Sequence, residues 1–292
     1  MNPKRVLVTG VNSYIGNSFM DYIKQFPEDY AAEGISVRNG AWQDIDFSRY
    51  DCVFDVAGIA HADVGHASEE TVQRYYAVNR DLTLALAQKA KAEGVKQFIF
   101  MSSAIVYGDS APIGKTKLIT ADTPPAPANF YGDSKLQAEN AILPLADDSF
   151  KVAILRPPMI YGKNSKGNYP ILAKLADKLP VFPKVNNTRS MLYVGNLTEF
   201  VRLIIKNEDS GIFFPQNAEY SNTSRLVQLI ARAHGKNIAL IGGCSWLLKM
   251  LSHATGLVNK AFGSLAYDMS MSEYKEDYHK YSLEESINMT EK

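Results

Sequence analysis

The sequence predicts an α/β protein in which a doubly wound parallel sheet is followed by a smaller, mixed C-terminal domain. Three observations lead to this prediction. A short apolar run at residues 6–8 is followed by a Gly-rich turn and the start of a helix. Two further apolar runs, at residues 52–58 and 96–103, flank one long helical pattern, an alternation typical of a parallel sheet. The length of 292 residues suits one sizeable domain and one smaller one.

The opening segment, residues 4–16, reads KRVLVTGVNSYIG. Its apolar run indicates a strand buried on both faces. Gly10 ends that strand with a turn, and Ser13 is suited to cap the helix that follows. Gly10 and Gly16 would let the backbone approach a pyrophosphate, to which a helix N-terminus offers N–H groups and positive dipole. This is the dinucleotide-binding pattern of a Rossmann-like fold, with Ser13 in place of the middle glycine.

The second strand, expected at residues 34–38, bears on the choice of cofactor. In this fold the end of that strand faces the adenosine ribose, where an acidic residue bonds hydroxyls and an arginine accepts a 2′-phosphate. Arg38 therefore favours NADP over NAD, and a solvated surface arginine is the alternative. The link to the next strand, expected at Ala41 and Trp42, is short, so we expect a helix to be missing or reduced there.

The remaining pattern divides the chain. The run at residues 52–58 ends in Ala57 and Gly58, which are small enough for a cofactor to lie close to the backbone. We expect residues 1–160 to form the dinucleotide-binding domain, to which later segments can return, and residues 161–292 to form mostly a substrate-binding domain. Other expected elements are a long helix from Ser68 to Gly94, a helix at 131–145, a strand at 150–155 and a last helix at 283–289.

Three polar residues stand where chemistry is expected. Ser103 ends a predicted strand, and Tyr131 and Lys135 lie one helical turn apart. Hydride transfer at a carbinol carbon needs a proton moved on the oxygen, and a phenol with a pKa of about 10 is a poor base at neutral pH. A nearby ammonium lowers that pKa towards the working range. We therefore predict Tyr131 as acid/base, Lys135 as its electrostatic partner and Ser103 as the residue that orients the substrate oxygen.

Composition excludes several classes of function. Lys plus Arg and Asp plus Glu both number 31, so the chain lacks the basic excess of most nucleic-acid-binding proteins. It shows neither a signal peptide nor a membrane-spanning run, and the five histidines form no ligand pattern, so we expect no metal. Cys52 and Cys244 are far apart, as expected for buried thiols in the reducing cytoplasm.

Taken together, the motifs resemble those of the extended short-chain dehydrogenase/reductases, in the NAD-dependent epimerase/dehydratase branch that acts on nucleotide sugars. The closest likeness is to capsule and cell-wall sugar enzymes that reduce a 4-keto UDP-sugar. Proteins similar to UDP-glucose/galactose 4-epimerase share the same motifs. The segments that carry the resemblance are TGVNSYIG (9–16), DVAG (55–58), VN (78–79), FMSSAIVYG (100–108), YGDSK (131–135), RPPMIYG (156–162) and RSMLYVGNL (189–197).

The resemblance implies roles for individual residues. Ser103, rather than Ser102, matches the catalytic serine because it directly precedes the A-x-V-Y-G segment. Asn168 and Arg189 match substrate-binding positions, with Arg189 at the diphosphate. Asp55 stands where the family commonly has a histidine. The implied cofactor-binding residues are Gly10, Ser13, Tyr14, Ile15, Gly16, Arg38, Ala57, Asn79, Tyr131, Lys135 and Pro158.

Several functions stay open at this point. The leading interpretation is NADP-dependent 4-keto reduction of a UDP-sugar for surface polysaccharide synthesis. The alternatives are a UDP-hexose 4-epimerase that retains NAD and a non-catalytic dinucleotide-binding sensor. Because Ala104 rather than an acidic residue follows Ser103, elimination of the C6 hydroxyl is disfavoured. The resemblance is also compatible with a homodimer.

Overall fold

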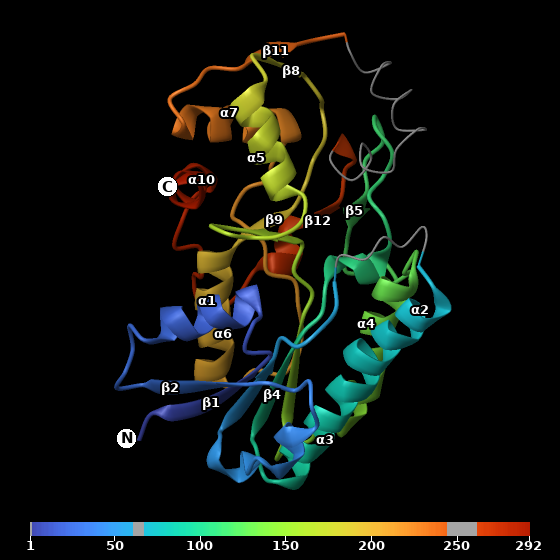
Figure 1. Ribbon diagram of the computed structural model, residues 1–292, viewed down its shortest axis with the longest axis vertical. Coiled ribbons are helices and arrows are strands. Elements are labelled where there is room, and N and C mark those ends of the chain that lie inside the picture. Colours follow the sequence, from blue (N-terminus) through green and yellow to red (C-terminus); the bar gives the residue numbers. More distant parts are fainter. Residues whose placement is uncertain (1, 61–66, 244–261) are drawn as a thin grey trace. The chain divides into compact units, whose positions relative to one another are not determined.

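The computed structural model describes residues 2–60, 67–243 and 262–292. It divides the chain into two compact units, and each is built from separate stretches of sequence (Figure 1). Unit 1 comprises Met1–Gly108, Pro125–Pro157 and Leu197–Pro215. Unit 2 comprises Asp109–Pro124, Pro158–Asn196 and Gln216–Lys292. Residues 109–124 therefore leave the expected N-terminal domain, and residues 197–215 return to it.

Unit 1 contains a six-stranded sheet in the order β10-β6-β4-β3-β1-β2. All neighbouring strands run parallel, which confirms the predicted Rossmann-like α/β fold. The order reverses at β1, where a doubly wound sheet positions its ligand. The strands are β1 (Lys4–Thr9), β2 (Tyr30–Ile35), β3 (Cys52–Asp55), β4 (Gln97–Met101), β6 (Lys151–Leu155) and β10 (Gly211–Phe213).

Helices cover both faces of this sheet (Figure 1). On one face, Phe98 and Val152 pack with buried residues of α3 and α4, such as Leu86 and Ile142. On the other face, Phe19 of α1 meets Phe54 edge-on, with ring centroids 5.3 Å apart. Strands buried on both faces need the continuous apolar runs that the sequence shows. The helices are α1 (Tyr14–Ile23), α2 (Glu69–Tyr76), α3 (Thr83–Ala92), α4 (Phe130–Ile142) and α6 (Val194–Asn207).

Three expected elements of unit 1 differ from the observed ones. β2 begins and ends earlier than residues 34–38, because the Ile35 carbonyl accepts from the Gly10 amide at 2.9 Å, at the end of the strand. Ala41 and Trp42 belong to a short 3₁₀ helix rather than a strand, so the expected loss of a full helix after Arg38 is confirmed. The long helix begins at its Ser68 cap as predicted, but a π-helical turn at Ala77–Leu82 divides it into α2 and α3.

Unit 2 has the mixed, short elements that the sequence predicted. The strands in its described residues form two-stranded sheets: β5 with β12, β7 with β9, and β8 with β11. Its core is formed largely by α5, α7 and α10 together with β7, β8 and β9. The bounds are β5 (Leu118–Ile119), β7 (Met159–Tyr161), α5 (Tyr169–Lys178), β8 (Val181–Pro183), β9 (Met191–Tyr193), α7 (Thr223–Ala233), β11 (Ala239–Ile241), β12 (Ala266–Tyr267) and α10 (Leu283–Glu291). Ser282 and Glu285 form a capping box that starts α10.

Candidate active site

The turn after β1 has the geometry expected of a dinucleotide-binding turn. Gly10 adopts a φ of +81°, a conformation that side chains disfavour, and a β-carbon there would lie 3.4 Å from the Ala57 backbone. Ser13 is the N-cap of α1, and its Oγ accepts from the Gly16 amide at 3.3 Å. The cap satisfies one N–H of the first turn, and a first turn leaves further amides for an anion. These features fit the phosphates of a dinucleotide.

Gly16, in the first turn of α1, allows this helix to pack closely against the sheet. A β-carbon on Gly16 would lie 2.9 Å from Val56 Cγ2 and 3.1 Å from Val8 Cγ1. The glycine therefore lets the first turn of α1 lie directly against the ends of β1 and β3. Tyr14 and Ile15, predicted beside it at the pyrophosphate, form the start of α1.

Asp55 ends β3 as a fully buried carboxylate. The Thr9 hydroxyl donates to it at 2.6 Å, the Thr83 hydroxyl at 3.0 Å and the Ala57 amide at 3.2 Å. Burial raises the pKa of Asp55, and these hydrogen bonds and the Lys135 charge oppose that rise. The carboxylate thus ties together the ends of β1 and β3, which Ala57 follows.

Asn79 lies in the π-helical turn and is completely buried. Its Oδ1 accepts from the Ile59 amide at 2.8 Å, while its Nδ2 donates to the Ile59 carbonyl and to Ser134 Oγ, both at 3.1 Å. A buried amide needs such partners. Asn79 therefore joins the loop after β3 to α4, and a role along the cofactor remains a prediction.

Ser103 and Tyr131 are brought together by the starts of a short 3₁₀ helix and of α4. Ser103 caps the 3₁₀ helix η4 (Ala104–Tyr107), where its Oγ accepts from the Ile105 amide at 3.2 Å. The Ser103 hydroxyl also hydrogen-bonds the phenol of Tyr131. Asn129 caps α4, so that Tyr131 lies in its first turn, and the Tyr75 ring packs edge-on at 5.9 Å.

Lys135 follows Tyr131 by one turn on the buried face of α4 and is only 5% exposed. Its Nζ donates to the Met101 carbonyl at 2.8 Å and lies 4.5 Å from the centre of the Phe100 ring. Burial lowers its pKa to about 8, against the opposing charges of Asp55 and Glu139. A lysine with a pKa lowered in this way is typical of functional sites.

The pKa of the Tyr131 phenol moves opposite to the expected direction. Burial raises it to about 12, and the hydrogen bond from Ser103 only partly offsets this rise. Desolvation disfavours the phenolate, and the Lys135 ammonium is engaged with the Met101 carbonyl. The residue pair that motivated the expectation is present, but in this geometry burial is the larger effect.

Glu139 and Arg156 form a buried ion pair beside these residues. Neither was predicted from the sequence as a site residue. Arg156 Nε lies 3.1 Å from each Glu139 oxygen, and the Ser102 hydroxyl also donates to the carboxylate. The available signal was spacing, because Glu139 continues the buried helix face of Tyr131 and Lys135.

The two residues predicted at opposite ends of the cofactor are Arg38 and Pro158. Arg38 is exposed and stands three residues beyond the end of β2. The residue that directly follows β2 is Ser36 rather than an acidic residue. Pro158 begins a stretch of unit 2, immediately before β7.

Unit 2 holds the two predicted substrate residues. Asn168 precedes α5, and its side chain makes no cap hydrogen bond there. The Arg189 guanidinium donates to the Gly263 carbonyl at 3.1 Å, and burial lowers its pKa to about 10. The backbone of Arg189 exchanges two hydrogen bonds with Ser221, each 2.9 Å long.

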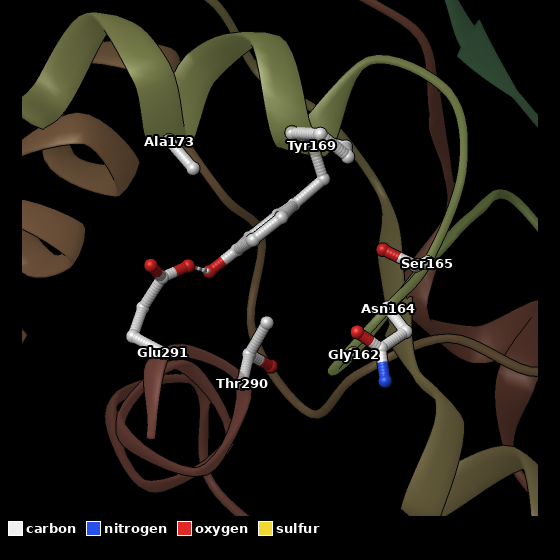
Figure 2. Close-up of a pocket in the computed structure, with 8 residues that line it drawn as sticks. Gly162, Asn164, Ser165, Tyr169, Ala173, Thr290 and Glu291 are labelled. Atoms are coloured by element: carbon white, nitrogen blue, oxygen red, sulfur yellow. Dashed lines mark hydrogen bonds between the residues drawn. The ribbon is translucent and has the colours of Figure 1, made fainter.

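A hollow of about 280 Å³ lies in unit 2 between the start of α5 and the end of α10 (Figure 2). Tyr169 points across it and donates to Glu291 at 2.7 Å, while Ser165 stands on the opposite wall. Its lining residues include neither Asn168 nor Arg189. The hollow therefore adds no support to the predicted substrate residues.

Metal ligands and membrane-spanning helices are both missing from residues 2–60, 67–243 and 262–292. His, Cys, Asp and Glu side chains in these ranges form no group of three or more that could hold a metal ion. Helices in the same ranges are too short or too polar to cross a bilayer. Cys52 is buried, which raises the pKa of its thiol, and Cys244 lies outside the described residues.

Comparisons with known proteins give a consistent family and a mixed set of reactions. The model of the NAD dependent epimerase/dehydratase family matches residues 6–214. A UDP-glucose 4-epimerase of Vibrio cholerae is 29% identical over 92% of this chain and 88% of its own. Among solved structures, a dTDP-4-dehydrorhamnose reductase from Clostridium acetobutylicum has a TM-score of 0.72 at 17% identity, covering 98% of both chains. A UDP-glucuronic acid 4-epimerase from Bacillus cereus with NAD has 0.69 at 15%, covering 98% of this chain and 94% of its own.

Proposed function

The chain belongs to the NAD dependent epimerase/dehydratase family, and from that membership we propose that it oxidises or reduces C4 of a nucleotide-linked hexose. The grouping of Ser103, Tyr131 and Lys135 in unit 1 is the observation that supports this most directly. A sensor that only binds a dinucleotide needs neither a general acid nor a buried ammonium beside it. We therefore place the sensor function below the catalytic one.

Each of the three residues has a separate task in the proposed reaction. A nicotinamide dinucleotide, when bound, supplies or accepts the hydride. The Ser103 hydroxyl orients the substrate oxygen against Tyr131, whose phenol gives or takes the proton on that oxygen. The Lys135 ammonium stabilises the phenolate that forms when Tyr131 loses its proton. Gly10, Ser13 and Ala57 are the residues that fit the dinucleotide.

The finer proposal is NADPH-dependent reduction of a 4-keto UDP-sugar. The segment after β2 supports it, because Ser36 leaves no carboxylate to repel a 2′-phosphate and the exposed Arg38 can attract one. A reductase exchanges its cofactor at every turnover. The exposed setting of Arg38 suits a cofactor that enters and leaves. Arg189 of unit 2 is the proposed diphosphate ligand, since a guanidinium fork matches phosphate geometry.

A UDP-hexose 4-epimerase is the second candidate. The relative from Vibrio cholerae, matched over 88% of its length, is named UDP-glucose 4-epimerase. The same three residues serve both reactions, because an epimerase removes a hydride from C4 and returns it to the opposite face. The two functions differ in whether the dinucleotide stays bound.

The test separates the two by cofactor retention and by turnover. The purified protein is denatured, the released dinucleotide is identified by mass spectrometry, and a second sample is incubated with UDP-glucose or UDP-N-acetylglucosamine without added cofactor. Retained NAD together with C4 inversion supports the epimerase. Little retained dinucleotide, with NADPH oxidised only when a 4-keto UDP-sugar is added, supports the reductase. If the protein binds NAD(P) but shows neither C4 inversion nor NADPH oxidation, the result contradicts both the epimerase and the reductase and favours the sensor.

A further inference from the structure

Glu139 is the most heavily engaged buried carboxylate near the candidate active site. Its side chain is 1% exposed and lies one turn after Lys135 on α4. Arg156 contacts both carboxylate oxygens through Nε, at 3.1 Å each, and contacts Oε2 again through Nη2. The Ser102 hydroxyl donates to Oε1. The carboxylate therefore links α4 with the ends of β4 and β6.

The partners of Glu139 hold both ends of the helix that Ser103 caps. Ser102 immediately precedes Ser103, so its bond to Glu139 fixes the start of η4. Arg156 Nη1 donates to the Tyr107 hydroxyl at 2.7 Å, which fixes the last residue of η4. The next residue along from Arg156, Pro157, accepts from the first amide of η4, that of Ala104, at 2.9 Å.

We propose that Glu139 is a positioning residue that, through Ser102 and Arg156, holds the Ser103 hydroxyl against Tyr131 and Lys135. This inference rests on the proposed function of these three residues. Tyr131, Lys135 and Glu139 share α4, whereas Ser103 belongs to a different segment, so the distance between the two sets depends on contacts that cross from α4 to η4. The Glu139 network supplies such contacts at both ends of η4.

The energetics of buried ion pairs support a role in positioning rather than in stability. Desolvation offsets most of the attraction within such a pair, and a well-packed apolar replacement of both partners is often neutral or stabilising. The Glu139 carboxylate also favours the charged form of Lys135, which burial disfavours. Its removal is therefore expected to disturb both the geometry and the charge of the site.

The experiment compares Glu139→Gln with Glu199→Gln. Glu199 is also buried in unit 1, where Arg202 donates to it from Nε at 2.6 Å and the Tyr22 hydroxyl at 2.8 Å. Its partners lie on α6 and α1, which carry none of the three catalytic residues. Both variants replace a carboxylate that is paired with arginine and hydrogen-bonded to a hydroxyl. They differ in which helices that carboxylate joins.

The first arm needs no substrate. Hydrogen exchange of the η4 amides is measured by mass spectrometry in the parent and in both variants, with NAD(P) present. We expect Glu139→Gln to speed exchange in η4 by about tenfold or more and Glu199→Gln to leave it unchanged. Equal exchange in η4 for the two variants overturns the proposal. This arm gives an answer even if no UDP-sugar is turned over, so it separates this proposal from the proposed function.

The second arm is a double-mutant cycle with Ser103→Ala, measured by kcat and KM. We expect Glu139→Gln to lower kcat by up to about a hundredfold with little change in KM, the size expected for misplacement of a reacting group. In the Ser103→Ala background the same change should cost clearly less, and the loss that remains reflects the effect of Glu139 on the charge of Lys135. Equal losses in both backgrounds show that Glu139 does not act through Ser103. If Glu139→Gln does not fold, Glu139→Met with Arg156→Met removes both charges and takes its place in both arms.

Discussion

The backbone of Gly132 lies against the carbonyl of Ile105. A β-carbon at Gly132 would stand 2.7 Å from that oxygen and 3.0 Å from Pro127 Cβ. A β-carbon essentially never lies 2.7 Å from a carbonyl oxygen, so only glycine lets the first turn of α4 approach η4 so closely. The amide of the same Ile105 donates to Ser103 Oγ at 3.2 Å, and Tyr131 directly precedes Gly132. The glycine therefore sets the separation of Ser103 and Tyr131.

Gly132→Ala is expected to lower both stability and turnover. Alanine favours a helix by about 1 kcal/mol over glycine, but overpacking against a backbone carbonyl costs about 1–3 kcal/mol. The movement of α4 should reduce kcat by about tenfold or more. Urea unfolding and steady-state kinetics measure the two effects. Asn140→Ala, at an exposed position of the same helix, is the control and should change neither by much. Full activity in Gly132→Ala would show that the close approach is unnecessary.

Tyr131→Phe tests the general acid. The change removes one hydroxyl and keeps the ring that packs against Tyr75. Loss of a general acid–base group costs about a hundred- to ten-thousand-fold in rate. Turnover should fall by that factor, while the dissociation constant for NAD(P)H, measured by fluorescence titration, should stay close to that of the parent. A loss of less than about threefold, or about 0.7 kcal/mol of barrier, would remove Tyr131 from the mechanism.

Lys135→Met tests how the buried ammonium of Lys135 changes the free energy of unfolding as the pH is varied. The pKa of Lys135 falls from 10.5 to about 8 in the folded protein, so between these values the unfolded chain binds more protons than the folded one. The contribution of Lys135 to stability therefore rises as pH increases from about 8 to about 10.5.

Urea unfolding of parent and Lys135→Met at several pH values measures this contribution. The stability of the parent minus that of the variant should be lowest at neutral pH. It should increase towards pH 10 by about 1–3 kcal/mol, since one pKa unit corresponds to about 1.4 kcal/mol. A difference that does not change with pH would mean that the ammonium is solvated.

Arg38→Asp tests the choice of cofactor. A guanidinium can make charge-assisted bonds to a 2′-phosphate, worth about 1–3 kcal/mol at an exposed, screened site. The parent should therefore prefer NADPH over NADH by about 5- to 150-fold in dissociation constant. Aspartate should reverse the preference by removing attraction and adding repulsion. Titrations at two salt concentrations measure it, and a change at the exposed Arg49 of the 3₁₀ helix Phe47–Arg49, Arg49→Asp, controls for the change in net charge. Equal affinity of the parent for the two cofactors would make the epimerase the leading proposal.

Arg189→Ala tests the proposed diphosphate ligand. Removing one partner of a charged hydrogen bond should weaken UDP binding by about 1.5–3 kcal/mol. Calorimetry with UDP measures the change, and Arg225→Ala, an exposed arginine of α7 paired with Glu219, is the control. Because Arg189 also donates to the Gly263 carbonyl, thermal unfolding of the variant should be recorded alongside. Unchanged UDP affinity in a folded variant would exclude Arg189 from the site.

The parts of the fold and of the candidate site that could be predicted are those formed by residues close together in sequence. Examples are the strand–turn–helix at residues 4–23 and the Tyr131–Lys135 pair, whose members are four positions apart. The Glu139–Arg156 pair joins residues 17 apart on different elements, and nothing in the pattern of either element specifies its partner. Likewise, the strands of unit 2 are two or three residues long, too short for alternation to appear.

The direction of the Tyr131 pKa shift could not be predicted from sequence for the same reason, because it depends on residues far apart along the chain. Sequence spacing indicates which charge is near the phenol, but the strength of that charge depends on how much water the fold removes. Here burial is the largest effect on the Tyr131 pKa, and it exceeds the opposing effect of the hydrogen bond from Ser103. Burial of this kind arises from residues such as Tyr75, more than fifty positions away along the chain.

The interleaving of the two units has a consequence for biosynthesis. The edge strand β10 comes from Gly211–Phe213, so its pairing with β6 must wait until the ribosome has made the intervening segment, which includes a large part of unit 2. A nascent chain that stops near residue 160 would expose the edge of β6, an unpaired template for aggregation. Neither unit can be expressed by cutting the gene once. To produce unit 1 alone, residues 109–124 and 158–196 would each have to be replaced by a linker, the second of which still delivers β10 to β6, and the residues after 215 would have to be removed.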